Sequence, residues 1–278
     1  MAKVTTRELR VGKGTGRPLV MVTAYDAPTA RIADEAGVDL ILVGDSVAMV
    51  VLGYDDTLQV SVADMAHHTA AVARARPEPM IIADLPWMSY HTTVPETLRN
   101  AALLIRAGAQ AVKLEGGRKR SEMVDALTGA EIPVIGHLGL TPQSVNVMGG
   151  FRVQGLQLAS ALAIIDDARA LADAGCVAIV LEGMPDEVAR RVTEAVPVPT
   201  IGIGAGPYCD GQVLVFHDVV GLGDRTPAKF VRRFGDLRTD AIAGISSWAA
   251  EVRAGTFPAE AETYHLADEV AKALAGEV

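Results

Sequence analysis

Residues 40–46 read Leu-Ile-Leu-Val-Gly-Asp-Ser, a run of four apolar residues followed by a glycine and two polar residues. A short run of this kind is typical of a strand that is buried on both faces of a parallel sheet. Further runs along the chain have the same character. They are Val20–Thr23, Met80–Ala83, Ala111–Leu114, Pro133–Gly136, Ala178–Leu181, Thr200–Ile203 and Val213–Phe216.

Longer segments with apolar residues at helical spacing separate these runs. Helices are expected over Ala27–Ala36, Val62–Ala73, Pro95–Ala107 and Leu158–Ala172, and from Pro185 onward. Strands that alternate with helices in this way predict an α/β fold of the (β/α)₈ TIM barrel type, which usually takes about 250 residues. A doubly wound open sheet is the alternative. The last two runs lie too close together for a full crossover helix, so the eighth strand is the irregular unit.

The two ends of the chain carry helical signals of their own. Thr5-Thr6-Arg7-Glu8 has the pattern of a capping box, which predicts a short helix that plugs the N-terminal end of the barrel. Pro227–Gly255 is expected to be mostly helical. We interpret residues 1–278 as a single barrel domain with a C-terminal tail at 256–278. Three apolar residues of that tail have helical spacing and could dock on the body or on a neighbouring subunit: Leu266, Val270 and Leu274.

Composition excludes several classes of protein. Hydrophobic residues make up 50% of the chain and charged residues 21%, which is enough apolar material for a core. The net charge of −9 argues against nucleic-acid binding. The two cysteines, Cys176 and Cys209, form no disulfide framework, so a cytoplasmic location is expected. There is no signal-peptide pattern and no apolar stretch of the roughly 20 residues that cross a membrane.

Polar side chains follow five consecutive strands at the point where each strand ends. In chain order they are Asp45 with Ser46, Asp84, Lys113 with Glu115, His137, and Glu182. The carboxyl ends of the strands form the active-site rim of a TIM barrel. A single such residue is usually a cap or a turn former, but a polar residue at five strand ends in a row indicates a site.

Three of these residues, Asp45, Asp84 and Glu115, are carboxylates from neighbouring strands, which lie about 4.8 Å apart. Carboxylates so close together repel one another unless a cation or protons intervene. Oxygen ligands favour Mg²⁺ first and Mn²⁺ second. Because Mg²⁺ keeps several waters, Asp45 and Asp84 are expected to bind it directly, and Glu115 either directly or through water.

The remaining strand-end residues have several possible roles. Lys113 shares a face with Glu115 and could hold a substrate carboxylate or form a Schiff base. Its acidic neighbours favour the protonated form and hence the first role. Glu182 is a candidate general base, although it could instead cap the helix near Pro185. His137 could be a functional residue or a buried core histidine.

Several stretches resemble the ketopantoate hydroxymethyltransferase family (3-methyl-2-oxobutanoate hydroxymethyltransferases). They occur in the family's order and are Thr23–Asp26, Leu42–Ser46, Ala83–Pro86, Val112–Gly117, Gly136–Asn146, Leu181–Glu182, Ile201–Gly206 and Asp210–Gln212. The stretch around His137 is long and specific. The sequence departs most from the family pattern beyond Pro258.

This resemblance implies a TIM barrel of the phosphoenolpyruvate/pyruvate-binding superfamily with one Mg²⁺ per subunit. It implies transfer of a hydroxymethyl unit from 5,10-methylenetetrahydrofolate to 3-methyl-2-oxobutanoate, giving 2-dehydropantoate through a Mg²⁺-stabilised enolate. This reaction is the first step of pantothenate and coenzyme A biosynthesis. The expected partners are therefore a 2-oxo acid and a reduced folate. The resemblance also implies a homo-oligomer, a decamer built from two pentamer rings.

The resemblance also implies residue roles. Asp45, Asp84 and Glu115 are the metal site, and Glu182 is the proton acceptor. Ser46, Asp84 and Lys113 contact the keto acid. We also expect Asp45 and His137 to be substrate-binding residues. We expect His137 to hydrogen-bond the new hydroxymethyl oxygen or a water beside it.

Three rival functions stay open on the sequence. The first is a Mg²⁺-dependent 2-oxo acid lyase of the same superfamily, but such lyases use a cysteine-bearing loop, and neither cysteine follows a strand end. The second is a Schiff-base aldolase that uses Lys113. The third is a non-catalytic barrel, which would need no carboxylates at its strand ends.

Overall fold

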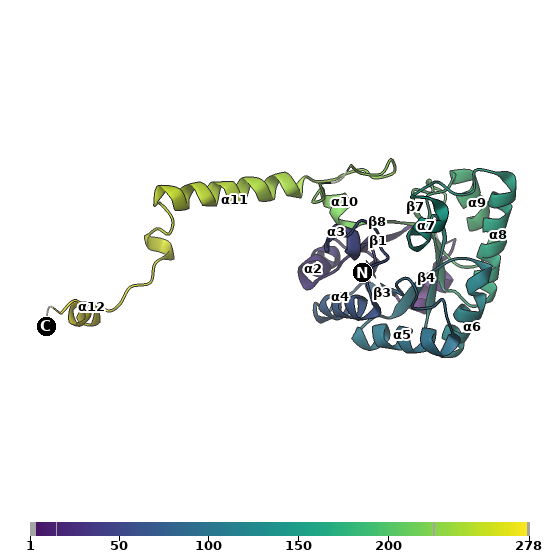
Figure 1. The fold of residues 1–278 in the computed structure, drawn as a ribbon, viewed down its shortest axis with the longest axis horizontal. Coiled ribbons are helices and arrows are strands. Elements are labelled where there is room, and N and C mark those ends of the chain that lie inside the picture. The colour runs from purple at the N-terminus through teal and green to yellow at the C-terminus, as the bar shows by residue number, and fades with distance from the viewer. Residues whose placement is uncertain (1–3, 15, 225, 277–278) are drawn as a thin grey trace.

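The protein is described by a computed structural model that covers residues 4–14, 16–224 and 226–276. Eight parallel strands form a closed barrel in sequence order, which confirms the predicted TIM barrel and excludes the open sheet (Figure 1). The strands are β1 (Leu19–Thr23), β2 (Leu40–Val43), β3 (Met80–Asp84), β4 (Ala111–Glu115), β5 (Val134–Gly139), β6 (Ala178–Glu182), β7 (Thr200–Ile203) and β8 (Gly211–Leu214).

Helices surround the strands. Those around the barrel are α2 (Ala27–Glu35), α4 (Val62–Arg74), α5 (Val94–Ala107), α6 (Ser121–Gly129), α8 (Leu158–Asp173) and α9 (Asp186–Ala195). Shorter turns lie in the loops and are α3 (Val47–Val50), η1 (Arg118–Arg120), η2 (Pro142–Ser144), α7 (Val145–Met148) and α10 (Phe216–Val220). Side-chain caps at Asp26, Ser61 and Thr93 start three of the long helices. These caps satisfy backbone N–H groups that have no partner inside the helix.

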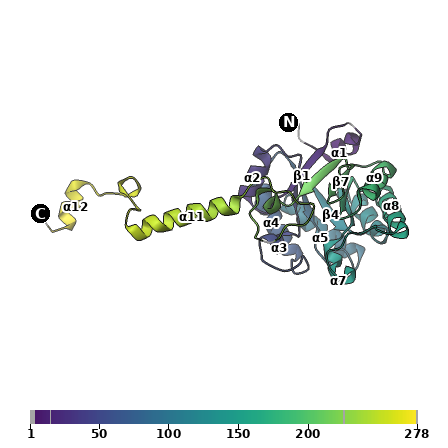
Figure 2. The same cartoon turned by 90° about the horizontal axis from the view of Figure 1, so that it is seen from above.

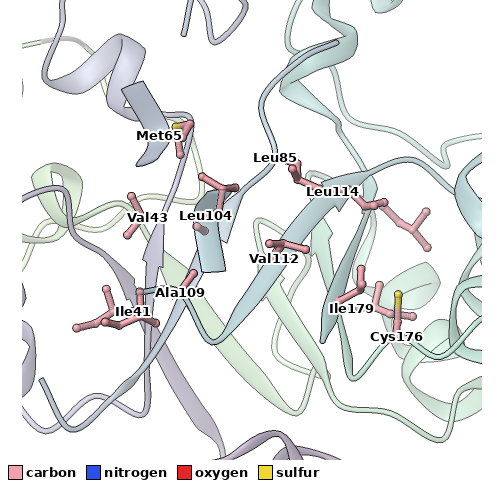
Figure 3. Close-up of a cluster of buried hydrophobic side chains, with 14 of the residues drawn as sticks. Ile41, Val43, Met65, Leu85, Leu104, Ala109, Val112, Leu114, Cys176 and Ile179 are labelled. Carbon is pink, nitrogen blue, oxygen red and sulfur yellow. The ribbon is translucent and has the colours of Figure 1, made fainter. Parts of the chain in front are cut away.

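One hydrophobic layer lies between the strands and the helices. Figure 3 shows strand residues such as Ile41 and Val112 in the same cluster as Met65 of α4 and Leu104 of α5. All four side chains are fully buried, with an exposed fraction of 0%. Alternate residues of each strand point outward into this layer, so the helices are held by apolar contact on that side.

A second hydrophobic cluster fills the barrel at the N-terminal ends of the strands. Leu40, Met80 and Ile135 point inward there, together with Leu9 of α1 (Thr6–Gly12). Leu9 is only 1% exposed. The Thr5 capping box is present, with Thr5 accepting from the Glu8 N–H and Glu8 accepting from the Thr5 N–H. The predicted helical plug is therefore confirmed.

The eighth unit differs from the expected pattern. Strand β8 covers Gly211–Leu214, two residues earlier than the predicted Val213–Phe216. Phe216 instead begins α10, where its N–H donates to the Thr23 hydroxyl at 2.9 Å. The segment 204–210 joins β7 to β8 without a helix, as the short spacing required.

The C-terminal part extends away from the barrel (Figures 1 and 2). It contains α11 (Leu237–Ala254), η3 (Glu260–Glu262) and α12 (Asp268–Leu274). The helix predicted from Pro227 begins only at 237, because Asp236 caps it by accepting from the Thr239 N–H. The three apolar tail residues are exposed, so they do not dock on the body of the described chain. The last two residues of the predicted tail, 277 and 278, lie outside the described residues.

No helix in the described part of the chain combines the length and apolar character needed to cross a membrane.

Candidate active site

The polar residues at the C-terminal mouth continue the inward-facing rows of the strands. In β3, Met80 and Ile82 point into the barrel, and Asp84 follows in the same phase. In β4, Ala111 points inward and is followed by Lys113 and Glu115. Because side chains alternate along a strand, this phase directs the polar groups into the barrel mouth. They are nonetheless buried, with Lys113 and Glu115 each 4% exposed.

The register of neighbouring strands sets these groups side by side. Asp84 is the register partner of Lys113, and Glu115 is the register partner of His137. The Lys113 ammonium lies 3.1 Å from Asp84 Oδ1. His137 Nδ1 lies 3.4 Å from Glu115 Oε1 and 3.2 Å from Lys113 Nζ. A neutral Nδ1 accepts from Lys113, whereas a protonated ring forms an ion pair with Glu115.

Asp45 enters from the turn that follows β2. Its backbone N–H donates to Asp84 Oδ2 at 3.0 Å. A side chain at Gly44 would meet Ser46 Oγ at 2.8 Å and Asp84 Oδ2 at 3.6 Å. Glycine at this position therefore leaves room for the Ser46 hydroxyl, whereas the distance to Asp84 is an ordinary van der Waals contact.

Burial and mutual repulsion govern the acidity of the carboxylates. Burial raises the pKa of Asp45, and the charges of Asp84 and Glu115 raise it further. Burial also raises the pKa of Asp84, with Lys113 opposing it. The pKa of Glu115 is lowered instead, because contacts with His137 and Lys113 outweigh the effect of burial. The cluster therefore retains negative charge on its β4 side.

Lys113 and His137 are the cationic members of the cluster. Burial lowers the pKa of Lys113, but Asp84, Glu115 and Asp45 together outweigh burial and raise it above the ordinary value. Burial and the Lys113 charge lower the pKa of His137, yet its contacts with Glu115 and Glu182 raise it to about 9. Lys113 thus stays protonated at neutral pH.

Glu182 ends β6 on the other side of His137. Its Oε2 lies 3.2 Å from His137 Nε2, and its side chain is 16% exposed. The helix that follows, α9, has Pro185 at its N-cap and no side-chain cap, so Glu182 does not serve as its cap. Glu182 is the most solvent-exposed of the four strand-end acids and stands apart from the group formed by Asp45, Asp84 and Glu115.

Two buried carboxylate oxygens are suited to a cation. Asp84 Oδ1 and Glu115 Oε1 accept no hydrogen bond from the described residues, and each instead forms an ion pair, Asp84 with Lys113 and Glu115 with His137. Within the described residues, no three Asp, Glu, His or Cys side chains form a preformed metal cage. Mg²⁺ does not require one, because it usually binds through one or two carboxylates and keeps water or substrate oxygens. The donor set therefore fits Mg²⁺.

Sequence reasoning missed three residues that contact this group. The Tyr25 hydroxyl lies 2.9 Å from Ser46 Oγ. Tyr90 and Gln143 hydrogen-bond the groups around Glu115 and Asp45. Tyr25 and Gln143 lie inside the family-like stretches, but a tyrosine or glutamine in a loop has no spacing that marks it. Tyr90 lies outside those stretches.

The sequence matches the family described as ketopantoate hydroxymethyltransferase over residues 3–260. A 3-methyl-2-oxobutanoate hydroxymethyltransferase of Methylobacterium sp. (strain 4-46) is 55% identical over 266 residues, which cover 96% of this chain and 92% of the relative. A second protein of that name, from Bradyrhizobium diazoefficiens, is 55% identical over 275 residues, covering 99% of this chain and 94% of the relative.

Solved structures with the same fold are more distant in sequence. A phosphonopyruvate hydrolase in complex with oxalate and Mg²⁺ is 16% identical, with a TM-score of 0.61 over 100% of this chain and 96% of that chain. A 2,3-dimethylmalate lyase of the PEP mutase/isocitrate lyase superfamily is 17% identical, with a TM-score of 0.58 over 99% and 95% of the two chains. At this identity they show the barrel fold alone. The sequence relatives decide the family, and the chain is a transferase enzyme that belongs to the ketopantoate hydroxymethyltransferases.

Proposed function

We propose that this enzyme transfers a hydroxymethyl unit from 5,10-methylenetetrahydrofolate to 3-methyl-2-oxobutanoate, giving 2-dehydropantoate for pantothenate and coenzyme A biosynthesis. The reaction balances with one water. The C3–H bond of the keto acid breaks and a C–C bond forms to the methylene carbon. That carbon leaves both folate nitrogens and keeps a hydroxyl from water, while the C3 proton and the second water proton end on those nitrogens. The names of the sequence relatives support this reaction.

The observation that carries the proposal is a protonated lysine buried among carboxylates at the mouth of the barrel. Lys113 is 4% exposed and lies 3.1 Å from Asp84 Oδ1. A fixed ammonium at this depth can bind the carboxylate of a 2-oxo acid. The same charge disfavours Schiff-base chemistry, which needs a neutral amine. Ser46, bonded to the Tyr25 hydroxyl, would donate to the same substrate carboxylate.

Asp45 and Asp84 would hold a Mg²⁺ ion directly, with Glu115 binding it directly or through water. Asp84 Oδ1 and Glu115 Oε1, which are buried and accept no hydrogen bond from the described residues, support this assignment. When bound, Mg²⁺ supplies Lewis-acid chemistry by drawing negative charge onto the keto oxygen of the substrate.

Glu182 would remove the C3 proton, because it is a strand-end acid that stands apart from the metal carboxylates. His137 lies 3.2 Å from it and would hold its carboxylate in place. Both ring nitrogens of His137 already face protein atoms. This favours a role in holding Glu182, and the expected bond from His137 to the new hydroxyl stays a prediction.

The two cysteines do not support the rival lyase. Cys176 is 1% exposed and precedes β6, and burial raises the pKa of its thiol to about 12. Cys209 lies just before β8, and burial raises its pKa as well. Both positions are at the N-terminal ends of strands, away from the mouth. Both thiols are free, which supports the proposal of a reducing, cytoplasmic location.

Proton NMR of 3-methyl-2-oxobutanoate in D₂O tests the half-reaction. With enzyme and Mg²⁺ but no folate, the C3 proton should exchange with solvent, and EDTA should stop the exchange. Exchange of the C3 proton that continues in the presence of EDTA would contradict the proposed role of the metal. Absence of exchange, together with no 2-dehydropantoate after 5,10-methylenetetrahydrofolate is added, would contradict the function.

We also propose a homo-oligomer, and a decamer on the family resemblance. Helix α11 buries no residue in the single chain. A row of its apolar side chains is exposed, namely Ile242, Ile245, Trp248 and Val252. An exposed apolar row at helical spacing is typical of a surface that another chain covers. Light scattering should give a mass near ten chains, and Trp248→Glu should lower it. A wild-type monomer would contradict the proposal.

A further inference from the structure

Gln143 is a buried side-chain amide, and both of its polar atoms have hydrogen-bond partners. It sits in η2, on the loop after β5, and is 5% exposed. Its Nε2 donates to Asp45 Oδ2 at 2.8 Å and to the Leu85 carbonyl at 3.0 Å. Its Oε1 accepts from the Tyr90 hydroxyl at 2.7 Å. A side chain that is satisfied at all of its hydrogen-bonding positions adopts one orientation.

The backbone of Gln143 contacts a second carboxylate. Pro142 precedes it in the first turn of η2, where backbone N–H groups have no partner within the helix. The Gln143 N–H donates instead to Glu115 Oε2 at 3.0 Å. One residue therefore contacts both Asp45 from β2 and Glu115 from β4.

Tyr90 fixes which end of the amide faces Asp45. Its hydroxyl accepts from the Glu115 N–H at 3.0 Å. The single hydroxyl proton goes to Gln143 Oε1 at 2.7 Å rather than to the Glu115 carbonyl at 3.4 Å, because the shorter contact is the stronger one. A flipped amide would set its oxygen against the Leu85 carbonyl and the Asp45 carboxylate, which both accept. The NH₂ group must therefore face Asp45.

We propose that Gln143 is a positioning residue, held by Tyr90, that fixes the Asp45 and Glu115 carboxylates in the geometry that binds the divalent cation. Each carboxylate has one oxygen bonded to Gln143, Asp45 through Oδ2 and Glu115 through Oε2. The second oxygen of each would bind the cation; that of Glu115, Oε1, faces His137 Nδ1 at 3.4 Å and accepts no hydrogen bond from the described residues. Partners of this kind orient metal ligands and are worth about 10- to 100-fold in metal affinity. The inference rests on the proposed function, since that function includes the metal.

Binding of Mn²⁺ alone, followed by electron paramagnetic resonance of the free ion, tests this inference without the reaction. Gln143→Leu keeps the approximate volume and removes both amide donors. It should raise the Kd for Mn²⁺ by about 10- to 100-fold. The same change at Gln154, on the same loop, is the matched control, because among the described residues that side chain bonds only to the Arg152 carbonyl. Gln154→Leu should bind Mn²⁺ as the wild type does.

Tyr90→Phe gives a second test with a smaller disturbance. Loss of one neutral hydrogen bond should raise the Kd by about 5-fold. If Tyr90 acts through Gln143, the effects on log Kd will not add, and Tyr90→Phe will change little in the Gln143→Leu background. This cycle does not depend on the activity of any variant.

Urea unfolding separates positioning from a merely structural role. A structural role predicts a lower unfolding midpoint for Gln143→Leu with an unchanged Kd for Mn²⁺ in the folded protein, and that result would overturn the inference. Should Gln143→Leu not fold, an unchanged Kd in Tyr90→Phe overturns it in the same way. Failure of the wild type to bind Mn²⁺ would overturn both the inference and the metal role on which it rests.

Discussion

The two ends of the barrel are built from the same strands but hold opposite kinds of side chain. At the N-terminal end, Leu40, Met80 and Ile135 close around Leu9 of the plug. At the C-terminal end, β3, which also carries Met80, supplies Asp84 to a buried charge cluster, and β4 supplies Lys113. Apolar burial stabilises the first end without requiring exact partners, whereas each group at the second end depends on a specific neighbour. Stability and chemistry are thus separated along β3 by the four residue steps from Met80 to Asp84, or roughly 13 Å.

The largest effect on the charged C-terminal end is expected from Glu182→Gln, which should lower turnover. Loss of a general base lowers turnover by about 10²- to 10⁴-fold. Binding of Mg²⁺ and keto acid should persist, because Glu182 stands apart from the metal carboxylates, and titration calorimetry checks this. Glu187→Gln, in the exposed first turn of α9, is the control. Loss of metal binding in Glu182→Gln would show that the division of roles is wrong.

Lys113→Met should destabilise the charged end. Removing one partner of a buried ion pair lowers the free energy of unfolding by about 3–5 kcal/mol, because Asp84 is left without its counter-charge. Urea unfolding in the presence of EDTA measures this, and added Mg²⁺ should restore part of the loss. The exposed Lys119→Met is the control. A Lys113→Met protein as stable as the wild type in EDTA would mean that Asp84 is neutral there.

Leu9→Ala tests the apolar end. It should lower the free energy of unfolding by about 2–5 kcal/mol, the usual effect of truncating a buried leucine, and leave the kcat of the folded enzyme unchanged. Leu103→Ala is the matched control, since Leu103 is 48% exposed on α5. A large loss of kcat in Leu9→Ala would show that the two ends are coupled.

The smallest expected effect concerns pH. Burial and the Arg120 charge lower the pKa of His91, beside Tyr90, to about 4. The unfolded chain, with a histidine pKa of about 6.5, therefore binds a proton between pH 6.5 and 4 that the folded chain does not. The contribution of neutral His91 to stability is complete above pH 6.5 and is lost as the pH falls toward 4.

Urea unfolding at pH 7, 6 and 5 checks this sign. The stability of His91→Gln should fall less over this range than that of the wild type. His67→Gln, at an exposed histidine, is the matched control. If the free energy of unfolding falls equally in His91→Gln and the wild type, then His91 has the same pKa in the folded and the unfolded chain, which would contradict the prediction.

The barrel and the polar strand ends could be predicted from sequence because both follow from alternation along buried strands. Asp84, Lys113 and Glu115 continue inward rows that the apolar residues before them already define. The eighth strand was misplaced, because the apolar Val215 and Phe216 read as strand. The Phe216 N–H instead donates a tertiary hydrogen bond to the Thr23 hydroxyl, and a helix begins there.

Other features have no local signal. Helix α11 begins at 237 because Asp236 caps it. The ten residues before it, 227–236, have a sequence that also looks helical, so the sequence does not mark the cap. Helix α6 was not predicted, because it is short and begins without a side-chain cap. The contacts of Gln143 with Asp45 and Leu85 join residues that are far apart in the chain, so only the closed barrel reveals them.

The line of contacts from Glu115 through His137 to Glu182 has a consequence for kinetics. The two carboxylates face opposite nitrogens of one imidazole ring, at 3.4 and 3.2 Å. His137 therefore joins a carboxylate of the proposed metal site to the proposed base through one ring. Replacing His137 alone should lower both the affinity for Mn²⁺ and the turnover number, whereas replacing Glu182 should lower the turnover number only.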